Sequence, residues 1–273
     1  MRGVTLQGTD INVSRLSFGT ASLHHLATSR RRQDLLAAAF DHGFSHFDTA
    51  PYYGFGIAEK ELGRFLRGRR GGITITTKIG LYPPGGSRPS TFSVGIRKTV
   101  GKVLPVYSRP VVDWSIAAAS KSLEKSLCRL RTDHIDLLLL HEPISGALPS
   151  DMFLEWLRDE QYRGRIRAWG LAGEADCMDS WLSIDHPLGM VLQVRDSLDR
   201  KEADFVRSRR RELQITYGYL SSSPRLSGVQ KATEILERAL WRNVHGSIIV
   251  STRKISRLSE LAEVAQRDDG YNH

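Results

Sequence analysis

Short apolar runs alternate with longer segments of helical periodicity along almost the whole chain. The run at residues 15–20 precedes a segment in which Leu35, Leu36 and Phe40 fall on one helix face before a glycine ends it. The run HIDLLLLHEP, which begins at His134, is continuously apolar in its middle, as expected of a parallel strand buried on both faces. The alternation predicts an α/β protein in which each strand is followed by a helix.

Eight strand-then-helix units follow one another in this pattern. The later predicted strands are the run that ends at Asp48 and the segments 73–80, 134–143, 166–171, 190–194, 213–217 and 247–250. The later predicted helices are the segments 57–66, 115–130, 152–163, 175–182, 202–209, 230–243 and 255–265. Eight such units in about 250 residues are typical of a closed (β/α)8 TIM barrel, so we predict a single barrel domain over residues 1–273. An open doubly wound sheet would require a complete glycine fingerprint after its first strand, and Gly54-Phe55-Gly56 lacks the third glycine.

The segment 81–113 interrupts this alternation after the third predicted strand. It contains YPPGGSRPS and VLPVYSRPVV, and loops longer than about 12 to 15 residues are usually functional or disordered. In a barrel this loop would lie over the C-terminal face, where active sites are found.

Composition and charge narrow the classes of partner. Of the 273 residues, 40% are hydrophobic and 25% are charged, which is typical of a globular protein with a large core. The net charge of +9 favours an anionic partner, but the basic clusters are not interleaved with aromatic residues, so we expect no nucleic-acid partner. We expect a cytoplasmic location and no membrane partner, because Cys128 and Cys177 form no CxxC pair and no signal segment or spanning apolar run is found. The oligomeric state is left open.

Ionisable residues gather at the ends of three neighbouring predicted strands. These residues are Asp48 with the following Tyr52 and Tyr53, Lys78, and His141. A cation beside a phenol favours tyrosinate, so we expect Lys78 to lower the pKa of the tyrosine while Asp48 keeps the lysine charged. A phenol tuned in this way can donate a proton to a developing alkoxide, and His141 can orient a carbonyl oxygen.

Other interpretations of these residues stay open at this point. Each residue taken alone fits a structural role, such as a tyrosine that covers the barrel rim. Lys78 could form a Schiff base in a lyase or aldolase, although a neighbouring carboxylate keeps the amine protonated. A hydrolase metal site could use His24, His46, Asp48 and His141, but the spacing provides no second histidine pair, so we expect no metal.

Several stretches of the chain resemble the aldo-keto reductase family. They include LSFGTASL, GFSHFDTAPYYGFGIAEKELG, TITTKIG, SLEKSLCRLRTDHIDLLLLHEP, GRIRAWGLAG, VLQV and GSIIVSTRKISRLSEL. The D-T-A-x-x-Y-G-x-x-x-x-E-x-x-L-G pattern within them is specific, and the resemblance extends over nearly the whole chain.

The resemblance implies an NADPH-dependent reductase that converts an aldehyde or ketone to an alcohol by hydride transfer. The implied catalytic residues are Asp48, Tyr53, Lys78 and His141, with Tyr53 as general acid. The implied cofactor-binding residues are Gly19, Thr20, Asp48, Gln193, Tyr217, Thr252, Arg253, Arg257 and Glu260. Within this set, Gln193 would hold the carboxamide and Tyr217 would stack on the nicotinamide ring.

Phosphate binding at the last strand and helix has independent support. Arginine binds phosphate through two parallel hydrogen bonds, and a helix N-terminus adds a favourable dipole, so Arg253 and Arg257 favour NADPH over NADH. For the substrate pocket we expect contributions from Tyr52, Phe55 and Trp114.

Three features depart from the family pattern. Ala172 and Gly173 stand where relatives carry polar side chains that bind the carboxamide, so we expect fewer cofactor hydrogen bonds unless Glu174 or backbone groups replace them. Leu261 stands where an asparagine beside Glu260 would contact adenine, and the C-terminal tail is short. A non-catalytic nicotinamide-binding barrel therefore stays an alternative.

Overall fold

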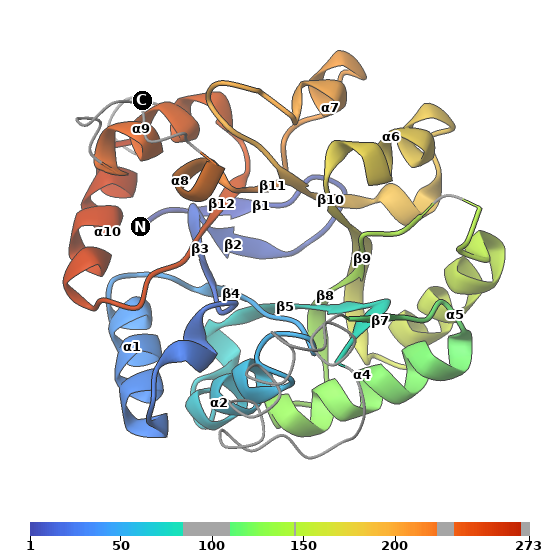
Figure 1. The fold of residues 1–273 in the computed structure, drawn as a ribbon, viewed down its shortest axis with the longest axis horizontal. Coiled ribbons are helices and arrows are strands. Elements are labelled where there is room, and N and C mark those ends of the chain that lie inside the picture. The colour runs from blue at the N-terminus through green and yellow to red at the C-terminus, as the bar shows by residue number, and fades with distance from the viewer. Residues whose placement is uncertain (84–109, 145, 223–231, 269–273) are drawn as a thin grey trace, which may run out of the picture.

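Eight parallel strands close into a barrel with helices around it (Figure 1). The structure is a computed structural model that describes residues 1–83, 110–144, 146–222 and 232–268. The barrel strands are β3 (Leu16–Gly19), β4 (His46–Asp48), β5 (Thr74–Ile79), β8 (Ile135–His141), β9 (Ile166–Gly173), β10 (Val191–Arg195), β11 (Ile215–Tyr217) and β12 (Ser247–Val250). Strand β12 pairs with β3 and closes the barrel, which confirms the predicted (β/α)8 fold.

Helices cover the outside of the barrel. They are α1 (Ser29–Asp41), α2 (Ile57–Phe65), α4 (Ile116–Leu130), α5 (Ser150–Tyr162), α6 (Ala175–Ser183), α7 (Asp204–Ser208), α9 (Ala232–Arg242) and α10 (Ser256–Asp268), with the short α8 (Tyr219–Ser222) after β11. Side-chain caps mark two of the starts: Thr28 accepts a hydrogen bond from Arg31 N at 3.3 Å, and Ser115 accepts one from Ala118 N at 3.2 Å. These caps satisfy backbone donors that a helix start leaves unpaired.

Both faces of the barrel strands are buried, which explains the continuous apolar run in β8. Leu138 and Leu140 belong to the outer core between strands and helices, whereas Leu137 and Leu139 belong to the inner core of the barrel. Neighbouring residues of a strand point to opposite faces, so a strand buried on both sides needs apolar residues throughout.

An antiparallel hairpin of β1 (Gly3–Thr5) and β2 (Asn12–Ser14) covers the amino-terminal end of the barrel interior. Its apolar residues Ile11 and Val13 pack in the inner core with Leu137, near the start of β8. This hairpin was not predicted from the sequence, because three-residue strands are too short to show periodicity. The hairpin leaves the carboxyl ends of the strands as the open side of the barrel.

The predicted long loop begins and ends in a small antiparallel ribbon of β6 (Leu81–Tyr82) and β7 (Val111–Val112). Strand β6 follows the carboxyl end of β5, so the loop starts on the C-terminal side of the barrel, as the sequence predicts. Residues 84–109 of this loop and residues 269–273 of the tail lie outside the described residues.

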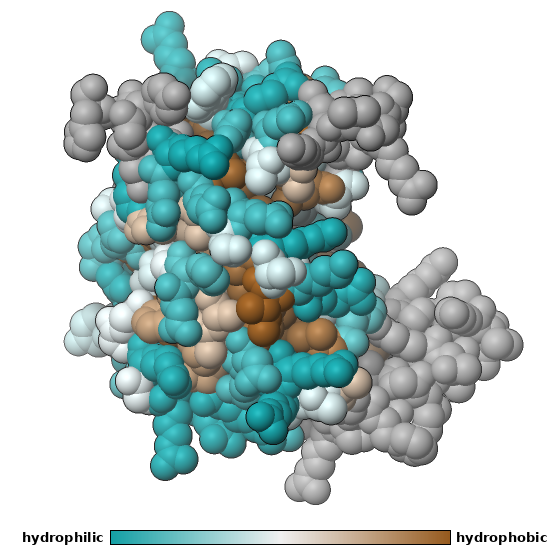
Figure 2. Space-filling view, turned by 90° about the vertical axis from the view of Figure 1, so that its left-hand side faces the viewer, coloured by the Kyte–Doolittle hydropathy of each residue, from teal (hydrophilic) through white to brown (hydrophobic). Residues whose placement is uncertain are grey.

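The outer helices carry polar residues on their solvent side. Figure 2 shows the face formed by α1, α9 and α10, which is mostly hydrophilic with smaller hydrophobic areas between the polar side chains. Within the described ranges, no helix combines the length and the apolar composition needed to cross a membrane.

Candidate active site

The carboxyl ends of the strands surround a cavity of about 750 Å³. Every barrel strand contributes to its wall, through Gly19, Asp48, Lys78, His141, Ala172, Gln193, Tyr217 and Ile249. Parallel strands end on the same side of a sheet, and alternate side chains point inward, so residues far apart in sequence meet there.

Lys78 lies at the centre of a buried polar cluster in this wall. Its Nζ donates hydrogen bonds to the two carboxylate oxygens of Asp48 at 2.8 and 2.6 Å and to the Thr49 carbonyl at 3.0 Å. The same nitrogen lies 3.4 Å from the Tyr53 hydroxyl, and the Tyr53 ring meets the His141 ring edge to face at 6.3 Å between centroids. The structure therefore brings together the four side chains that the family resemblance implies as catalytic.

The turn after β4 decides which of the two tyrosines enters the cavity. Gly54, Phe55 and Gly56 have φ angles of 59°, 54° and 85°, a left-handed conformation that favours glycine. Tyr53 lines the cavity, whereas Tyr52 packs outside it against Phe55 with ring centroids 6.1 Å apart. The local backbone thus selects Tyr53.

The electrostatics of Tyr53 differ from the sequence-based expectation. The pKa of Tyr53 is raised well above its usual value, first by burial and then by the Asp48 and Glu142 carboxylates. The expectation of a lowered pKa is wrong, because burial and the two carboxylates outweigh the charge of Lys78, which is already paired with Asp48. The phenol therefore carries its proton at neutral pH.

Burial also shifts the other two basic groups. It lowers the pKa of Lys78, and the nearby Asp48 carboxylate opposes that shift. It lowers the pKa of His141 to about 3, with a smaller contribution from the Lys78 charge. His141 is therefore a neutral imidazole that can exchange hydrogen bonds with a substrate oxygen.

Two buried polar atoms in the cavity wall have no hydrogen-bond partner among the described residues. They are Gln193 Oε1 and His141 Nδ1. The other end of the Gln193 amide is fixed, because its Nε2 donates to Asp48 Oδ2 at 2.9 Å. Buried polar atoms are normally hydrogen-bonded, so these two atoms fit polar groups of a bound ligand.

Gly19 lines the cavity, whereas the neighbouring Thr20 is not among the described lining residues. A Cβ at residue 19 would approach Ser251 Oγ to 2.5 Å and Ile249 Cγ2 to 2.8 Å, so a larger residue there would force these side chains to move. Thr20 is fully buried and donates a hydrogen bond to the Asp48 carbonyl at 2.9 Å, which positions the Asp48 backbone.

Of the two arginines predicted to bind phosphate, Arg257 on the first turn of α10 lines the cavity, whereas Arg253 is exposed outside its lining. Glu260, predicted to bind another part of the cofactor, is also exposed outside the lining. The Thr252 hydroxyl accepts a hydrogen bond from Lys254 N at 3.1 Å and so stabilises its own turn. Leu261 is buried in the outer core, which explains an apolar residue beside Glu260.

The residues expected to shape the substrate pocket, Tyr52, Phe55 and Trp114, are not among the described residues that line the cavity. Tyr52 and Phe55 form a small cluster of their own, and Trp114 is buried in the outer core. The Trp114 ring covers Gly80, where a Cβ would approach it to 2.1 Å, and packs against Phe153 with ring centroids 6.0 Å apart. By contrast, Glu142 lines the cavity, and sequence reasoning missed it although it follows His141 directly.

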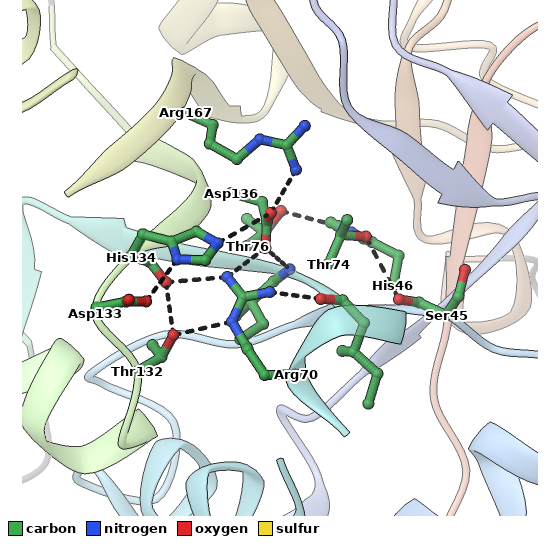
Figure 3. Close-up of polar contacts among 12 residues, drawn as sticks. Ser45, His46, Arg70, Thr74, Thr76, Thr132, Asp133, His134, Asp136 and Arg167 are labelled. Carbon is green, nitrogen blue, oxygen red and sulfur yellow. Dashed lines mark hydrogen bonds and ion pairs between the residues drawn. The ribbon is translucent and has the colours of Figure 1, made fainter. Parts of the chain in front are cut away.

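The sequence offered His46 as a possible metal ligand, but both of its ring nitrogens form hydrogen bonds with threonine hydroxyls. Its two ring nitrogens lie 2.8 Å from Thr74 Oγ1 and 2.9 Å from Thr76 Oγ1, and burial lowers its pKa to about 4. Figure 3 shows it near a second polar cluster centred on Asp136. Among the described residues no group of three or more histidine, cysteine or acidic side chains could hold a metal ion.

Comparison with known proteins agrees with this fold. The profile of the aldo/keto reductase family matches residues 15–181, and the chain belongs to this family. Over 173 residues it is 34% identical to a D-threo-aldose 1-dehydrogenase of a Pseudomonas species, covering 58% of this chain and 50% of that protein. It is 28% identical to L-galactose dehydrogenase of Arabidopsis thaliana, covering 62% of this chain and 47% of the relative. The chain thus spans about half the length of these curated relatives.

Solved structures share the fold over nearly their whole length. A candidate aldo-keto reductase from Pseudomonas aeruginosa superposes with a TM-score of 0.75 at 26% identity, covering 97% of this chain and 95% of that one. An aldo-keto reductase from Klebsiella pneumoniae, solved in complex with NADPH, has a TM-score of 0.69 at 21% identity, covering 97% and 90%.

Proposed function

We propose that this protein is an NADPH-dependent oxidoreductase that reduces an aldehyde or ketone to an alcohol, with Tyr53 as general acid. The observation that carries the proposal is the buried cluster in which Lys78 Nζ contacts both Asp48 and the Tyr53 hydroxyl inside the cavity. The family membership and the relatives named as sugar dehydrogenases support the same class of reaction.

Each side chain has a distinct part in this proposal. A bound nicotinamide cofactor supplies the hydride to the carbonyl carbon. Tyr53 holds a proton on its phenol oxygen and donates it to the carbonyl oxygen as negative charge develops there. Lys78 stabilises the resulting phenolate, Asp48 holds Lys78 in place, and the neutral His141 orients the carbonyl oxygen through a hydrogen bond.

The cavity wall fits the two polar ends of the cofactor. Gln193 Oε1 is buried and lacks a partner in the described ranges, so it is suited to accept a hydrogen bond from the carboxamide. Arg257 at the start of α10 is suited to bind the 2′-phosphate, which distinguishes NADPH from NADH. Tyr217 also lines the cavity and has an aromatic ring suited to stack on the nicotinamide.

A direct test combines binding with turnover. NADPH and NADH are titrated by quenching of tryptophan fluorescence, and NADPH absorbance is then followed with aromatic, aliphatic and sugar aldehydes. We expect tighter binding of NADPH and its oxidation by at least one aldehyde class. Absence of NADPH binding would refute the proposal, whereas binding without turnover of any aldehyde would favour the non-catalytic alternative. Cytoplasmic location and the absence of a nucleic-acid partner stay predictions from the sequence.

A further inference from the structure

Glu142 adopts an unusual backbone conformation at the end of β8. Its φ is +55°, in the left-handed region that residues with a side chain rarely occupy. Its backbone N–H donates to the Ala172 carbonyl at 2.7 Å, so the pairing of β8 with β9 continues through this residue and holds it there. A strained conformation that the sheet maintains beside a proposed catalytic residue indicates a functional constraint on Glu142.

The side chain of Glu142 lies over Gly173 in the cavity wall, where Gly173 and the adjacent Ala172 offer no polar side chain. Ala172 and Gly173 both line the cavity there. A Cβ placed on Gly173 would lie 3.4 Å from both Cα and Cγ of Glu142, so the glutamate side chain covers the glycine. Glu142 therefore brings a carboxylate to the wall beside two residues that have none.

The charge of this carboxylate acts on two tyrosines of the cavity wall. It contributes to the raised pKa values of Tyr53 and Tyr217, which line the cavity from β4's turn and from β11. The nearby Glu174 forms an ion pair with Arg195 at 2.6 Å, whereas the Glu142 carboxylate has no hydrogen-bond or ion-pair partner in the described part of the chain. Its negative charge is therefore not neutralised by a neighbouring cation there.

We propose that Glu142 is a cofactor-binding residue whose carboxylate lies beside the nicotinamide ring and binds the oxidised, cationic form more tightly than the neutral reduced form. This inference rests on the proposed function, because it needs a nicotinamide in the cavity. During reduction the ring loses a hydride and gains a positive charge, while the carbonyl takes up that hydride and a proton from Tyr53. A carboxylate at this place therefore favours the reduction direction on the enzyme.

The test compares NADP⁺ and NADPH affinities of the whole protein and its Glu142→Gln variant by fluorescence titration at neutral pH. Glutamine keeps the size of the side chain and removes its charge. We expect NADP⁺ binding to weaken roughly threefold to tenfold, as for a solvent-accessible charge pair, and NADPH binding to stay the same within about twofold. Glu142→Asn, which tolerates a left-handed backbone better, should give the same loss and guards against a folding defect.

Glu174→Gln provides the matched comparison, because it removes another carboxylate of the cavity wall that is paired with Arg195. A selective loss of NADP⁺ affinity in Glu142→Gln that is larger than in Glu174→Gln supports the inference. An unchanged ratio of the two affinities in both Glu142 variants, with binding retained, overturns it and leaves the proposed function intact. A wild-type protein that binds neither nucleotide overturns both.

Discussion

Lys78 Nζ donates hydrogen bonds to both carboxylate oxygens of Asp48 inside the barrel, where the two side chains are 2% and 5% exposed. Removing either residue would destabilise the fold, because the charge of the other would then be buried without a counter-charge. The pair also fixes the position of the ammonium group 3.4 Å from the Tyr53 hydroxyl. Stability and chemistry therefore depend on the same contact.

Asp48→Asn should destabilise the protein by about 3 kcal/mol and lower its reductase activity strongly, because it leaves Lys78 without its counter-charge. The pKa of Lys78 should fall further, since Asp48 opposes the effect of burial. Urea denaturation measures the free energy of unfolding. The double variant Asp48→Asn with Lys78→Met should recover stability but not activity. Recovery of both would show that the Asp48–Lys78 pair has no role in catalysis.

Tyr53→Phe should reduce turnover by about 100-fold to 10,000-fold, the usual contribution of general acid catalysis, and leave NADPH binding unchanged. Steady-state kinetics and fluorescence titration separate the two effects. Tyr52→Phe is the matched control, because Tyr52 packs outside the cavity and should retain activity. Equal losses in both variants would contradict the selection of Tyr53 by the turn.

The rate of carbonyl reduction should show no decline between about pH 6 and pH 9 from loss of the Tyr53 proton. The pKa of Tyr53 is raised above its usual value of 10.0, so the protonated, proton-donating form persists throughout this range and is lost only at higher pH. His141, with its pKa lowered to about 3, also stays neutral there. A descending limb near pH 7 that disappears in Tyr53→Phe would contradict the raised pKa.

Arg257→Ala should weaken NADPH binding about tenfold and leave NADH binding nearly unchanged, because the lost contact is with the 2′-phosphate. Arg253→Ala removes an arginine from the same segment that is exposed outside the cavity lining, and it should have a smaller effect. Fluorescence titration of both nucleotides measures these affinities. An equal loss of NADH and NADPH affinity in Arg257→Ala would rule out a phosphate-specific contact.

Asp136→Ala should destabilise the fold by about 3 kcal/mol without changing cofactor affinity. The Asp136 carboxylate is 1% exposed and lies 2.8 Å from Arg70, from Arg167 and from the Ile75 N–H, near the starts of β5 and β8 (Figure 3). Asp159→Ala breaks only an exposed pair with Arg163 and should cost less than about 1 kcal/mol. Urea denaturation measures the loss of stability in each of the two variants. Similar losses in both would contradict the view that burial makes the Asp136 ion pairs important.

The barrel and its polar residues at the strand ends were predictable from the sequence for a common reason. Strands buried on both faces leave continuous apolar runs, such as the four leucines of β8, and amphipathic helices leave a periodic pattern, so both can be recognised locally. Once the strands are parallel, Asp48, Lys78 and His141 must meet at the same end of the barrel. Tyr52 and Tyr53 follow Asp48 closely, and the resemblance to aldo-keto reductases selected Tyr53 as the catalytic one.

Properties that depend on distances between segments far apart in the sequence could be determined only from the tertiary structure. The pKa of Tyr53 moved opposite to the expectation because burial and two carboxylates outweigh a lysine that is already paired. Trp114 proved to cover Gly80 from the outer core, and Glu142 proved to face the cavity over Gly173. Desolvation and competition between neighbouring charges arise only when distant residues are packed together. These effects therefore cannot be predicted directly from the order of residues along the chain.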